Sequence, residues 1–253
     1  MADGREYLLY VPAGIPGPNA PLLVSMHGWG GNPAAHADAS GLDDFADTYK
    51  AIVAYPKGVT TPLTQFGATG TGWDYRFQAS ADITFLRDVV ADIKSTRCVN
   101  PRQVHAEGLS MGGPMSQRLA CEASDVFASV ISSMANDVEE PWVDLVTGAS
   151  SPSQACDPDR PVSVYLSCGL FDIATPNGCE PTAIAWAERS GCAPSGGVDD
   201  AYGHKRTYTQ CDAGTQVIWR RWFWQPHNYL WGAYRDQWFS EMNQFFAANP
   251  RPW

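Results

Sequence analysis

The chain has 253 residues, of which 44% are apolar and 17% are charged, and this length allows one α/β domain with a sizeable core. Its formal net charge of −10 argues against nucleic-acid recognition, which needs basic patches, and against adhesion to anionic membranes. No apolar run is long enough for a membrane-spanning helix. These properties fit a soluble, secreted, monomeric enzyme with neither a nucleic-acid nor a membrane partner.

Apolar, strand-like runs alternate with helical patterns along the chain. In chain order, strands are expected at 6–11, 21–26, 51–55, 103–107, 128–133, 162–168 and 215–224. Helical periodicity occurs near 35–48, 82–96, 111–121, 181–190 and 233–247. This alternation predicts a mostly parallel central sheet with helices on both faces, in which ligands bind beyond the carboxyl ends of the strands.

The whole chain, 1–253, is predicted to be one catalytic domain, because it contains no repeat, low-complexity tract or long linker. Segment 136–160 has no strong periodicity, and we interpret it as a cap or loop over the site. Residues 249–253 are interpreted as a tail that begins a linker. We recognise no signal peptide, so that Met1 either stands where one was removed or is a genuine start.

A nucleophile elbow is indicated by the pentapeptide Gly108-Leu109-Ser110-Met111-Gly112, which lies between an expected strand and an expected helix. In a G-x-S-x-G elbow, strand and helix backbones come so close that a β-carbon at either outer position would clash. The amides at the start of the helix then surround the serine and favour negative charge that develops there. We therefore expect Ser110 to be a catalytic nucleophile.

A serine hydroxyl needs a base to take its proton and a further group to orient that base. In the α/β-hydrolase fold these residues follow one another in the order serine, acid, histidine. Asp172 follows the strand at 162–168 and His227 follows the last expected strand, whereas Asp157 and Asp159 precede the former strand and would lie at its wrong end. The sequence thus predicts an α/β-hydrolase fold with Ser110, Asp172 and His227 as its catalytic triad.

The oxyanion of the tetrahedral intermediate should be bound by two backbone amides. We expect one from Met111, next to the nucleophile, and one from Trp29, in the loop after the strand at 21–26. Gly28 would let this loop bend, and the His27 side chain is interpreted as a structural pin. Such chemistry requires neither a metal nor a cofactor.

Seven cysteines favour an oxidising compartment, although seven reduced and buried thiols in a cytosolic protein are the alternative. Cys98 and Cys121 flank the elbow unit and should both lie at the bottom of the sheet, where a disulfide is geometrically reasonable. Cys192 and Cys211 flank a polar loop. The odd count leaves one thiol over, for which Cys168 is the candidate. No C-x-x-C pair occurs, which argues against zinc.

Several segments carry a family resemblance: Gly4–Pro12, His27–Asn32, Gly108–Gly113, Gly169–Asp172 and the spacing to His227. Together they resemble the secreted esterases that group feruloyl esterases with polyhydroxybutyrate depolymerases. The resemblance implies a disulfide between Cys192 and Cys211, and the surroundings of Cys98 and Cys121 are typical of the feruloyl esterase branch. The chain departs from the family at Trp224-Gln225-Pro226, where a glycine-rich approach to the histidine is usual, and in the acid loop. These departures bear on the substrate more than on the chemistry.

Aromatic side chains in loops near the expected site are the candidates for substrate binding: Trp29, Trp73, Tyr75 and Trp231. Aromatic faces suit a phenolic acyl group, a sugar ring or a polyester chain equally well. The resemblance favours feruloyl esters of plant cell-wall polysaccharides and a polymeric ester substrate. Polyhydroxybutyrate depolymerase and acetylxylan esterase remain alternatives.

Other functional classes fit less well. A non-catalytic polysaccharide-binding module would not need serine, acid and histidine in the expected order. The chain lacks the long apolar lid of a lipase and the second domain of a peptidase that restricts access to its site.

Overall fold

The computed structural model describes residues 4–15, 19–175, 179–193 and 196–252. Met1 and Trp253, at the two ends of the predicted domain, lie outside these ranges. Within them, a nine-stranded sheet has the spatial order β1 (Tyr7–Tyr10), β3 (Ile52–Pro56), β2 (Ala20–Met26), β6 (Val99–Leu109), β7 (Ser129–Ser133), β10 (Ser163–Gly169), β13 (Val217–Trp222), β12 (Gly203–Tyr208) and β11 (Gly197–Asp200). The strands from β3 to β13 run parallel, and β1, β12 and β11 pair antiparallel at the edges.

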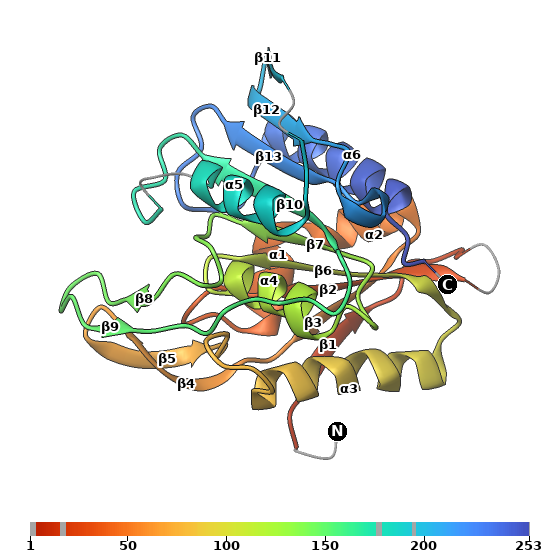
Figure 1. The fold of residues 1–253 in the computed structure, drawn as a ribbon. Coiled ribbons are helices and arrows are strands. Elements are labelled where there is room, and N and C mark those ends of the chain that lie inside the picture. Colours follow the sequence, from red (N-terminus) through yellow and green to blue (C-terminus); the bar gives the residue numbers. More distant parts are fainter. Residues whose placement is uncertain (1–3, 16–18, 176–178, 194–195, 253) are drawn as a thin grey trace.

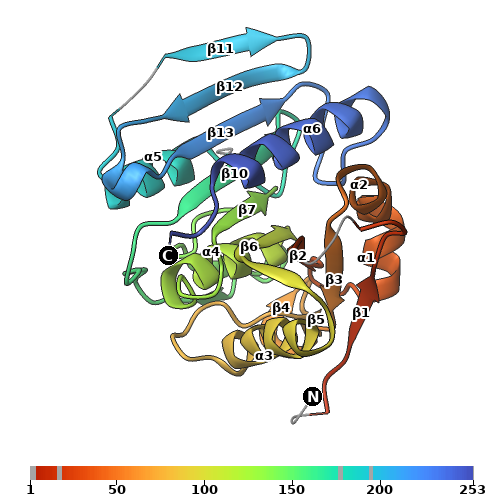
Figure 2. The same cartoon turned by 90° about the vertical axis from the view of Figure 1, so that its right-hand side faces the viewer.

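Helices cover both faces of this sheet, as Figures 1 and 2 show. One face carries α3 (Ala81–Thr96), α4 (Gly112–Glu122) and α5 (Glu180–Arg189), and the other carries α1 (Pro33–Ser40), α2 (Leu42–Tyr49) and α6 (Gly232–Ala248). In β2, Leu22 and Val24 belong to the first core cluster and Leu23 to the second. Central strands are apolar throughout because both of their faces are buried. The predicted mostly parallel sheet with helices on both faces is confirmed.

The elements that differ from the prediction have local causes. The helix expected at 35–48 is two helices, because Gly41 adopts a left-handed conformation with φ 65° between them. A hairpin of β4 (Val59–Gln65) and β5 (Ala68–Gly72) is not predicted by periodicity, since its sequence is rich in threonine and glycine. The edge strand β11 is likewise unpredicted, because all its residues are exposed and show no apolar alternation.

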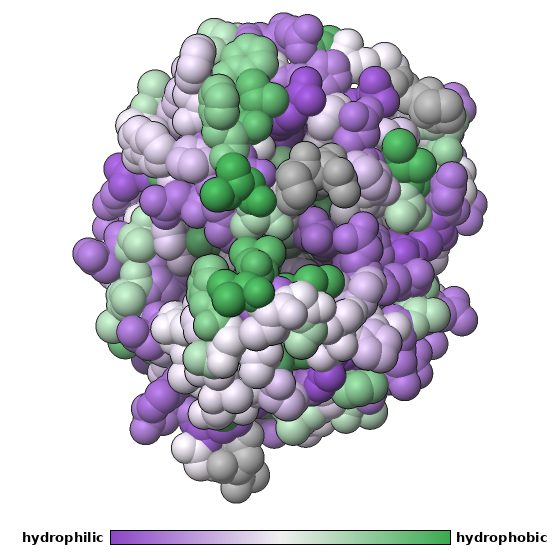
Figure 3. Space-filling model, turned by 90° about the vertical axis from the view of Figure 1, so that its left-hand side faces the viewer, coloured by the Kyte–Doolittle hydropathy of each residue, from purple (hydrophilic) through white to green (hydrophobic). Residues whose placement is uncertain are grey.

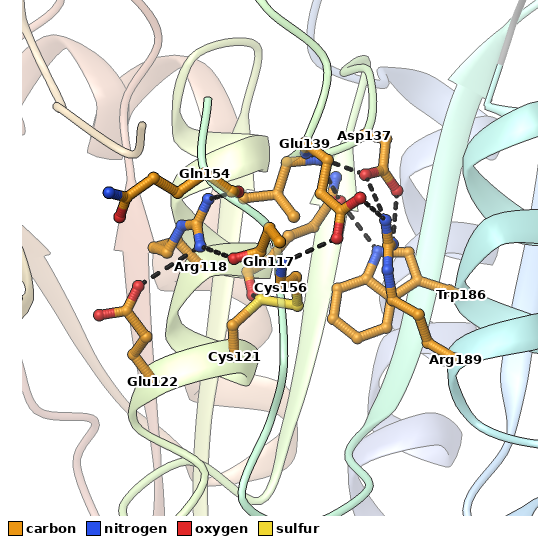
Figure 4. The surroundings of a disulfide bond; sticks show 12 residues. Gln117, Arg118, Cys121, Glu122, Asp137, Glu139, Gln154, Cys156, Trp186 and Arg189 are labelled. Carbon is orange, nitrogen blue, oxygen red and sulfur yellow. Dashed lines mark hydrogen bonds and ion pairs between the residues drawn. A yellow bond between two sulfur atoms is a disulfide. The ribbon is translucent and has the colours of Figure 1, made fainter. Parts of the chain in front are cut away.

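Segment 136–160 forms only the short pair β8 (Trp142–Val143) and β9 (Ser150–Ser151), yet buried contacts fasten it to α4 (Figure 4). The fully buried Arg118 guanidinium donates to the carbonyl oxygens of Gln154 at 2.6 Å and Ala155 at 2.9 Å. At its other end, Asp137 accepts two hydrogen bonds of 2.8 Å from Arg189 on α5. The segment is therefore held at both ends by charged side chains of the helices beneath it.

The cysteine pairing corrects two of the predictions. Cys121 forms a disulfide with Cys156 rather than with Cys98, which is free and exposed. Cys168 is not the free thiol, since it is bonded to Cys179 ahead of α5. No local pattern indicates that the chain around Cys156 returns across the end of α4, where it meets Cys121. The structure also pairs Cys192 with Cys211.

The carboxyl-terminal residues pack against the sheet instead of leaving it as a linker. Asn249 is buried and accepts a hydrogen bond of 2.6 Å from the Ser163 hydroxyl. Arg251 accepts a bond of 2.9 Å at its carbonyl oxygen from Arg102. Residues 249–251 are therefore packed on the domain, and the expectation that 249–253 begins a linker remains a prediction. None of the described helices is long and apolar enough to cross a membrane.

The Cys121–Cys156 disulfide should stabilise the fold by closing a loop with a sequence separation of 35 residues. Replacing both cysteines with serine is expected to lower the free energy of unfolding by about 3 kcal/mol, because the unfolded chain gains conformational entropy. Urea denaturation of the double variant, with Cys98→Ser as the control, measures this change. An unchanged midpoint in the double variant would contradict the prediction.

Candidate active site

The nucleophile elbow has no room for side chains at its outer positions. A β-carbon on Gly108 would lie 2.0 Å from the carbonyl oxygen of Gly112, and one on Gly112 would lie 2.2 Å from that of Met26. Ser110 at the apex has φ 55°, and its amide donates to the Ser133 carbonyl oxygen at 2.9 Å. A non-glycine residue in this conformation is strained, and the packed turn around it holds it there.

Ser110, His227 and Asp172 come together at the carboxyl ends of β6, β13 and β10. The Nε2 atom of His227 lies 2.9 Å from the Ser110 hydroxyl oxygen, and its Nδ1 lies 2.9 Å from both carboxylate oxygens of Asp172. The parallel strands end at one edge of the sheet, and residues 117 positions apart in the chain therefore meet. Nucleophile, base and orienting acid are thus connected by hydrogen bonds in the order that acyl transfer requires.

The Asp172 carboxylate is held in its ionised form. Its oxygens accept bonds from the Ala174 amide at 2.9 Å, the Thr175 amide at 3.1 Å and the Thr175 hydroxyl at 2.6 Å. Burial acts to raise the pKa of Asp172, but the hydrogen bond and charge of His227, together with Thr175, leave this pKa below its ordinary value. The carboxylate can therefore orient His227 and stabilise the imidazolium that forms during reaction.

The unusual Trp224-Gln225-Pro226 approach to His227 ties the two catalytic loops together. Gln225 is 2% exposed, and its side-chain amide donates to the carbonyl oxygens of Asn228 at 2.9 Å and Tyr229 at 3.1 Å. Its own carbonyl oxygen accepts from the Phe171 amide, next to the catalytic acid, at 3.0 Å. Hydrogen bonds of the glutamine thus shape this loop, where the family resemblance implies glycines.

The loop proposed for the oxyanion hole lies directly against the nucleophile. A β-carbon on Gly28 would lie 3.2 Å from Cβ and 3.7 Å from Oγ of Ser110. Within the described residues, the amides of Trp29 and Met111 donate to no protein acceptor. Both are therefore available to an oxyanion formed at Ser110.

His27 fastens this loop from within the protein. Its Nε2 accepts from the Gly58 amide at 3.0 Å, so that its Nδ1 donates to the Gly28 carbonyl oxygen at 2.7 Å. Burial lowers the pKa of His27, which keeps the ring neutral for this role. Trp73 is fully buried, and its indole N–H donates to the His27 carbonyl oxygen at 2.8 Å. The prediction that Trp73 binds substrate is therefore wrong, because this side chain supports the loop from the core.

A cavity of about 440 Å³ opens beside the triad and contains Ser110 and His227 in its wall. Of the aromatic residues predicted to bind substrate, Trp29 and Tyr75 line it. Trp231 is not among the lining residues, and it lies 55% exposed outside the cavity. Phe66 and Trp142 also line the cavity but are not predicted from the sequence, because periodicity does not place the β4–β5 hairpin or segment 136–160.

Exposed apolar side chains also lie on the two loops that carry Asp172 and His227. Phe171 and Trp224 stack with ring centroids 5.5 Å apart, and Ile173 is 90% exposed beside them. The strand expected at 215–224 ends at Trp222, which leaves Trp224 in the turn with φ 57° and 73% exposure. Figure 3 shows strongly apolar groups around a recess on one face of the molecule. Such a concentration of exposed apolar groups is typical of a binding surface.

Within the described ranges, no group of three or more histidine, cysteine, aspartate or glutamate side chains is arranged to hold a metal ion.

Comparison with known proteins finds similarity to esterases. No family model matches it. Feruloyl esterase B of Piromyces equi is 27% identical over 233 residues, which cover 84% of this chain and 40% of the relative. Poly(3-hydroxyalkanoate) depolymerase C of Paucimonas lemoignei is 31% identical over 126 residues, which cover 47% of this chain and 28% of the relative. The chain thus spans less than half the length of these two relatives.

Among solved structures, the acetyl xylan esterase from Aspergillus awamori superimposes with a TM-score of 0.72 at 17% identity. The match covers 97% of this chain and 94% of the other. At this identity the likeness concerns the fold, and together with the central parallel sheet it confirms the predicted α/β-hydrolase class.

Gly169 is the position where the acid loop and the histidine loop touch, since a β-carbon there would lie 2.1 Å from the Gln225 carbonyl oxygen. Gly169→Ala is expected to lower kcat at least about tenfold by separating Asp172 from His227. Steady-state kinetics on a soluble ester measures this. Gly196→Ala is the matched control, because its β-carbon would meet nothing within 4 Å. Equal kcat values for the two variants would refute the prediction.

Proposed function

We propose that this chain, a member of the esterases of α/β-hydrolase fold that group feruloyl esterases with polyhydroxybutyrate depolymerases, hydrolyses carboxylic esters through an acyl-enzyme on Ser110. The observation that carries the proposal is the unbroken hydrogen-bonded row from Ser110 through His227 to Asp172. We also propose that it acts as a single catalytic domain and as a monomer; the triad itself needs no side chain from a second copy.

The reaction begins when the Ser110 oxygen attacks the ester carbonyl carbon while His227 Nε2 takes the hydroxyl proton. Asp172 holds the ring through Nδ1 and stabilises its positive charge. The amides of Met111 and Trp29 bind the oxyanion. His227 then returns the proton to the leaving alcohol as the carbon–oxygen bond breaks, which leaves the acyl group on Ser110. Water, activated by His227, attacks this acyl group and releases the acid.

A bulky aromatic acyl group fits the cavity best. Trp29, Phe66, Tyr75 and Trp142 supply aromatic faces to a space of about 440 Å³, whereas an acetyl group would leave most of that volume unfilled. We therefore favour feruloyl-type esters on plant cell-wall polysaccharides as the substrate. The exposed Phe171, Ile173 and Trp224 on the loops of Asp172 and His227 make polyester depolymerisation the second candidate, because they would suit an apolar polymer.

Secretion is also part of this proposal. Three disulfides link described residues of a chain of 253 residues, and structural disulfides persist in oxidising environments.

Ser110→Ala should abolish ester hydrolysis, with kcat falling by about 10³-fold or more, because no acyl-enzyme can form. Initial rates on methyl ferulate, p-nitrophenyl acetate, acetylated xylan and a hydroxybutyrate oligomer would measure activity and rank substrates together. Preference for the oligomer would favour the depolymerase candidate. Full activity of Ser110→Ala would refute the proposed chemistry.

Phe66 should contribute to binding of the acyl group, since it lines the cavity and meets Trp29 edge to face at 6.0 Å. Phe66→Ala is expected to raise KM for methyl ferulate by about five- to tenfold, from the loss of roughly 1 kcal/mol of aromatic contact. Phe77→Ala is the control, because Phe77 is also exposed but does not line the cavity. The same KM in both variants would argue against an aromatic acyl pocket at this position.

A further inference from the structure

The loop that carries His227 is tied, two residues later, to a row of polar side chains in the core. The Tyr229 hydroxyl is hydrogen-bonded to Nδ1 of His36 on α1. His36 Nε2 lies 2.7 Å from the Ser25 hydroxyl on β2, which in turn lies 2.6 Å from a carboxylate oxygen of Glu107 on β6. Ser25, His36 and Glu107 are all at most 6% exposed. The triad uses none of these four side chains.

The direction of each hydrogen bond follows from the protons available. Burial lowers the pKa of His36 to about 3, so that its ring is neutral and carries one proton. When Glu107 is ionised it can only accept, and Ser25 therefore gives it its single hydroxyl proton. Ser25 must then accept from His36 Nε2–H, which leaves Nδ1 to accept from the Tyr229 hydroxyl. Every donor in the row thus points from Tyr229 toward Glu107.

Protonation of Glu107 on Oε2, the oxygen that faces Ser25, would reverse the whole row. Burial raises the pKa of Glu107 to about 7, against the opposing effects of the Ser25 and Ser133 hydroxyls. A protonated Glu107 donates to Ser25, Ser25 donates to His36 Nε2, and His36 then carries its proton on Nδ1 and donates to the Tyr229 oxygen. The hydroxyl of Tyr229 changes from donor to acceptor, although every side chain in the row keeps the same hydrogen-bond partners.

No ion pair compensates Glu107 within the described residues. Titratable groups around Glu107 come from three elements and the histidine loop. His36 lies on α1, Tyr55 on β3 and Tyr229 on the histidine loop. Tyr55 is bonded at 2.7 Å to Asp43 on α2. β7, β10 and α6 contribute Ser133, Ser167 and Trp238 to a cavity of about 30 Å³ beside the carboxyl group. That cavity has room for about one water molecule.

We propose that Tyr229, His36, Ser25 and Glu107 form a positioning chain for the catalytic histidine, whose hydrogen-bond direction is set by the proton on Glu107. Gln225 holds the backbone of the histidine loop, and the positioning chain connects the Tyr229 side chain of the same loop to β6, the strand that leads to Ser110. When Glu107 is ionised, the histidine loop is held by a hydrogen bond that the Tyr229 hydroxyl donates to His36 Nδ1. None of the four residues touches the reacting atoms, and the effect on turnover rests on the proposed esterase function.

Turnover tests the positioning role. Tyr229→Phe removes only the hydroxyl, and kcat per active site is expected to fall about tenfold with KM within about twofold, because His227 loses its alignment with Ser110. Active sites are counted with an organophosphorus reagent, so that loss of folded protein does not enter the value. Tyr10→Phe is the matched control, since Tyr10 bonds to Asp47 on the surface. An unchanged kcat in Tyr229→Phe overturns the positioning role.

The pH dependence of kcat tests whether the proton on Glu107 affects turnover. Between roughly pH 5 and 9, kcat of the wild-type enzyme should show an inflection that Glu107→Gln removes, because glutamine cannot titrate. Glu188→Gln, at an exposed position of α5, should keep the wild-type profile. Identical profiles for wild type and Glu107→Gln overturn the role of the Glu107 proton.

A measurement without turnover separates this proposal from the esterase function. In ¹⁵N-histidine-labelled protein, the NMR signals of His36 should change from the Nδ1–H to the Nε2–H tautomer as pH rises, and Glu107→Gln should abolish the change. This result would support the reversal of the row even if no ester were hydrolysed. A single His36 tautomer across the range in the wild type overturns it.

Discussion

The site depends on one close backbone approach. At Gly108 and Gly112, β6, α4 and β2 come together with no space for a β-carbon. This approach holds Ser110 at φ 55° and brings the loop after β2 to its hydroxyl. Nucleophile and oxyanion donors are therefore set by backbone packing, which does not rearrange when charge develops. A larger residue at either glycine would displace the nucleophile and the oxyanion donors together.

The base and the acid are positioned by a different means, because they lie on loops beyond the strands. Loops need their polar backbone groups satisfied, and side chains supply the partners here. Thr175 bonds the Asp172 carboxylate, and Gln225 joins the acid loop to the histidine loop. The chemistry thus combines a rigid nucleophile with two loops whose alignment is maintained by specific hydrogen bonds.

Strand order and local pattern are enough to predict the sheet and the meeting of the three side chains proposed as the triad. Ser110, Asp172 and His227 come after three apolar strands, and parallel strands bring such residues to one edge. A disulfide between segments that meet only in the tertiary structure leaves no local pattern in the sequence. For this reason the sequence favours Cys98 over Cys156 as the partner of Cys121, although the structure pairs Cys121 with Cys156. Trp73 is wrongly predicted to bind substrate because loop position does not reveal burial. The contribution of Phe66 likewise depends on how a polar hairpin folds over the site.

Chemistry and substrate selection consequently reside in different parts of the chain. The triad comes from loops at the ends of sheet strands, whereas much of the cavity wall comes from the β4–β5 hairpin and segment 136–145. That segment continues to Gln154 and Cys156, where the Arg118 guanidinium and the disulfide with Cys121 bind it to α4, the same helix that starts at the elbow. Because α4 anchors both parts, the cavity wall is fixed relative to Ser110. Sequence changes in the wall are therefore expected to alter the acyl group that is accepted without moving Ser110.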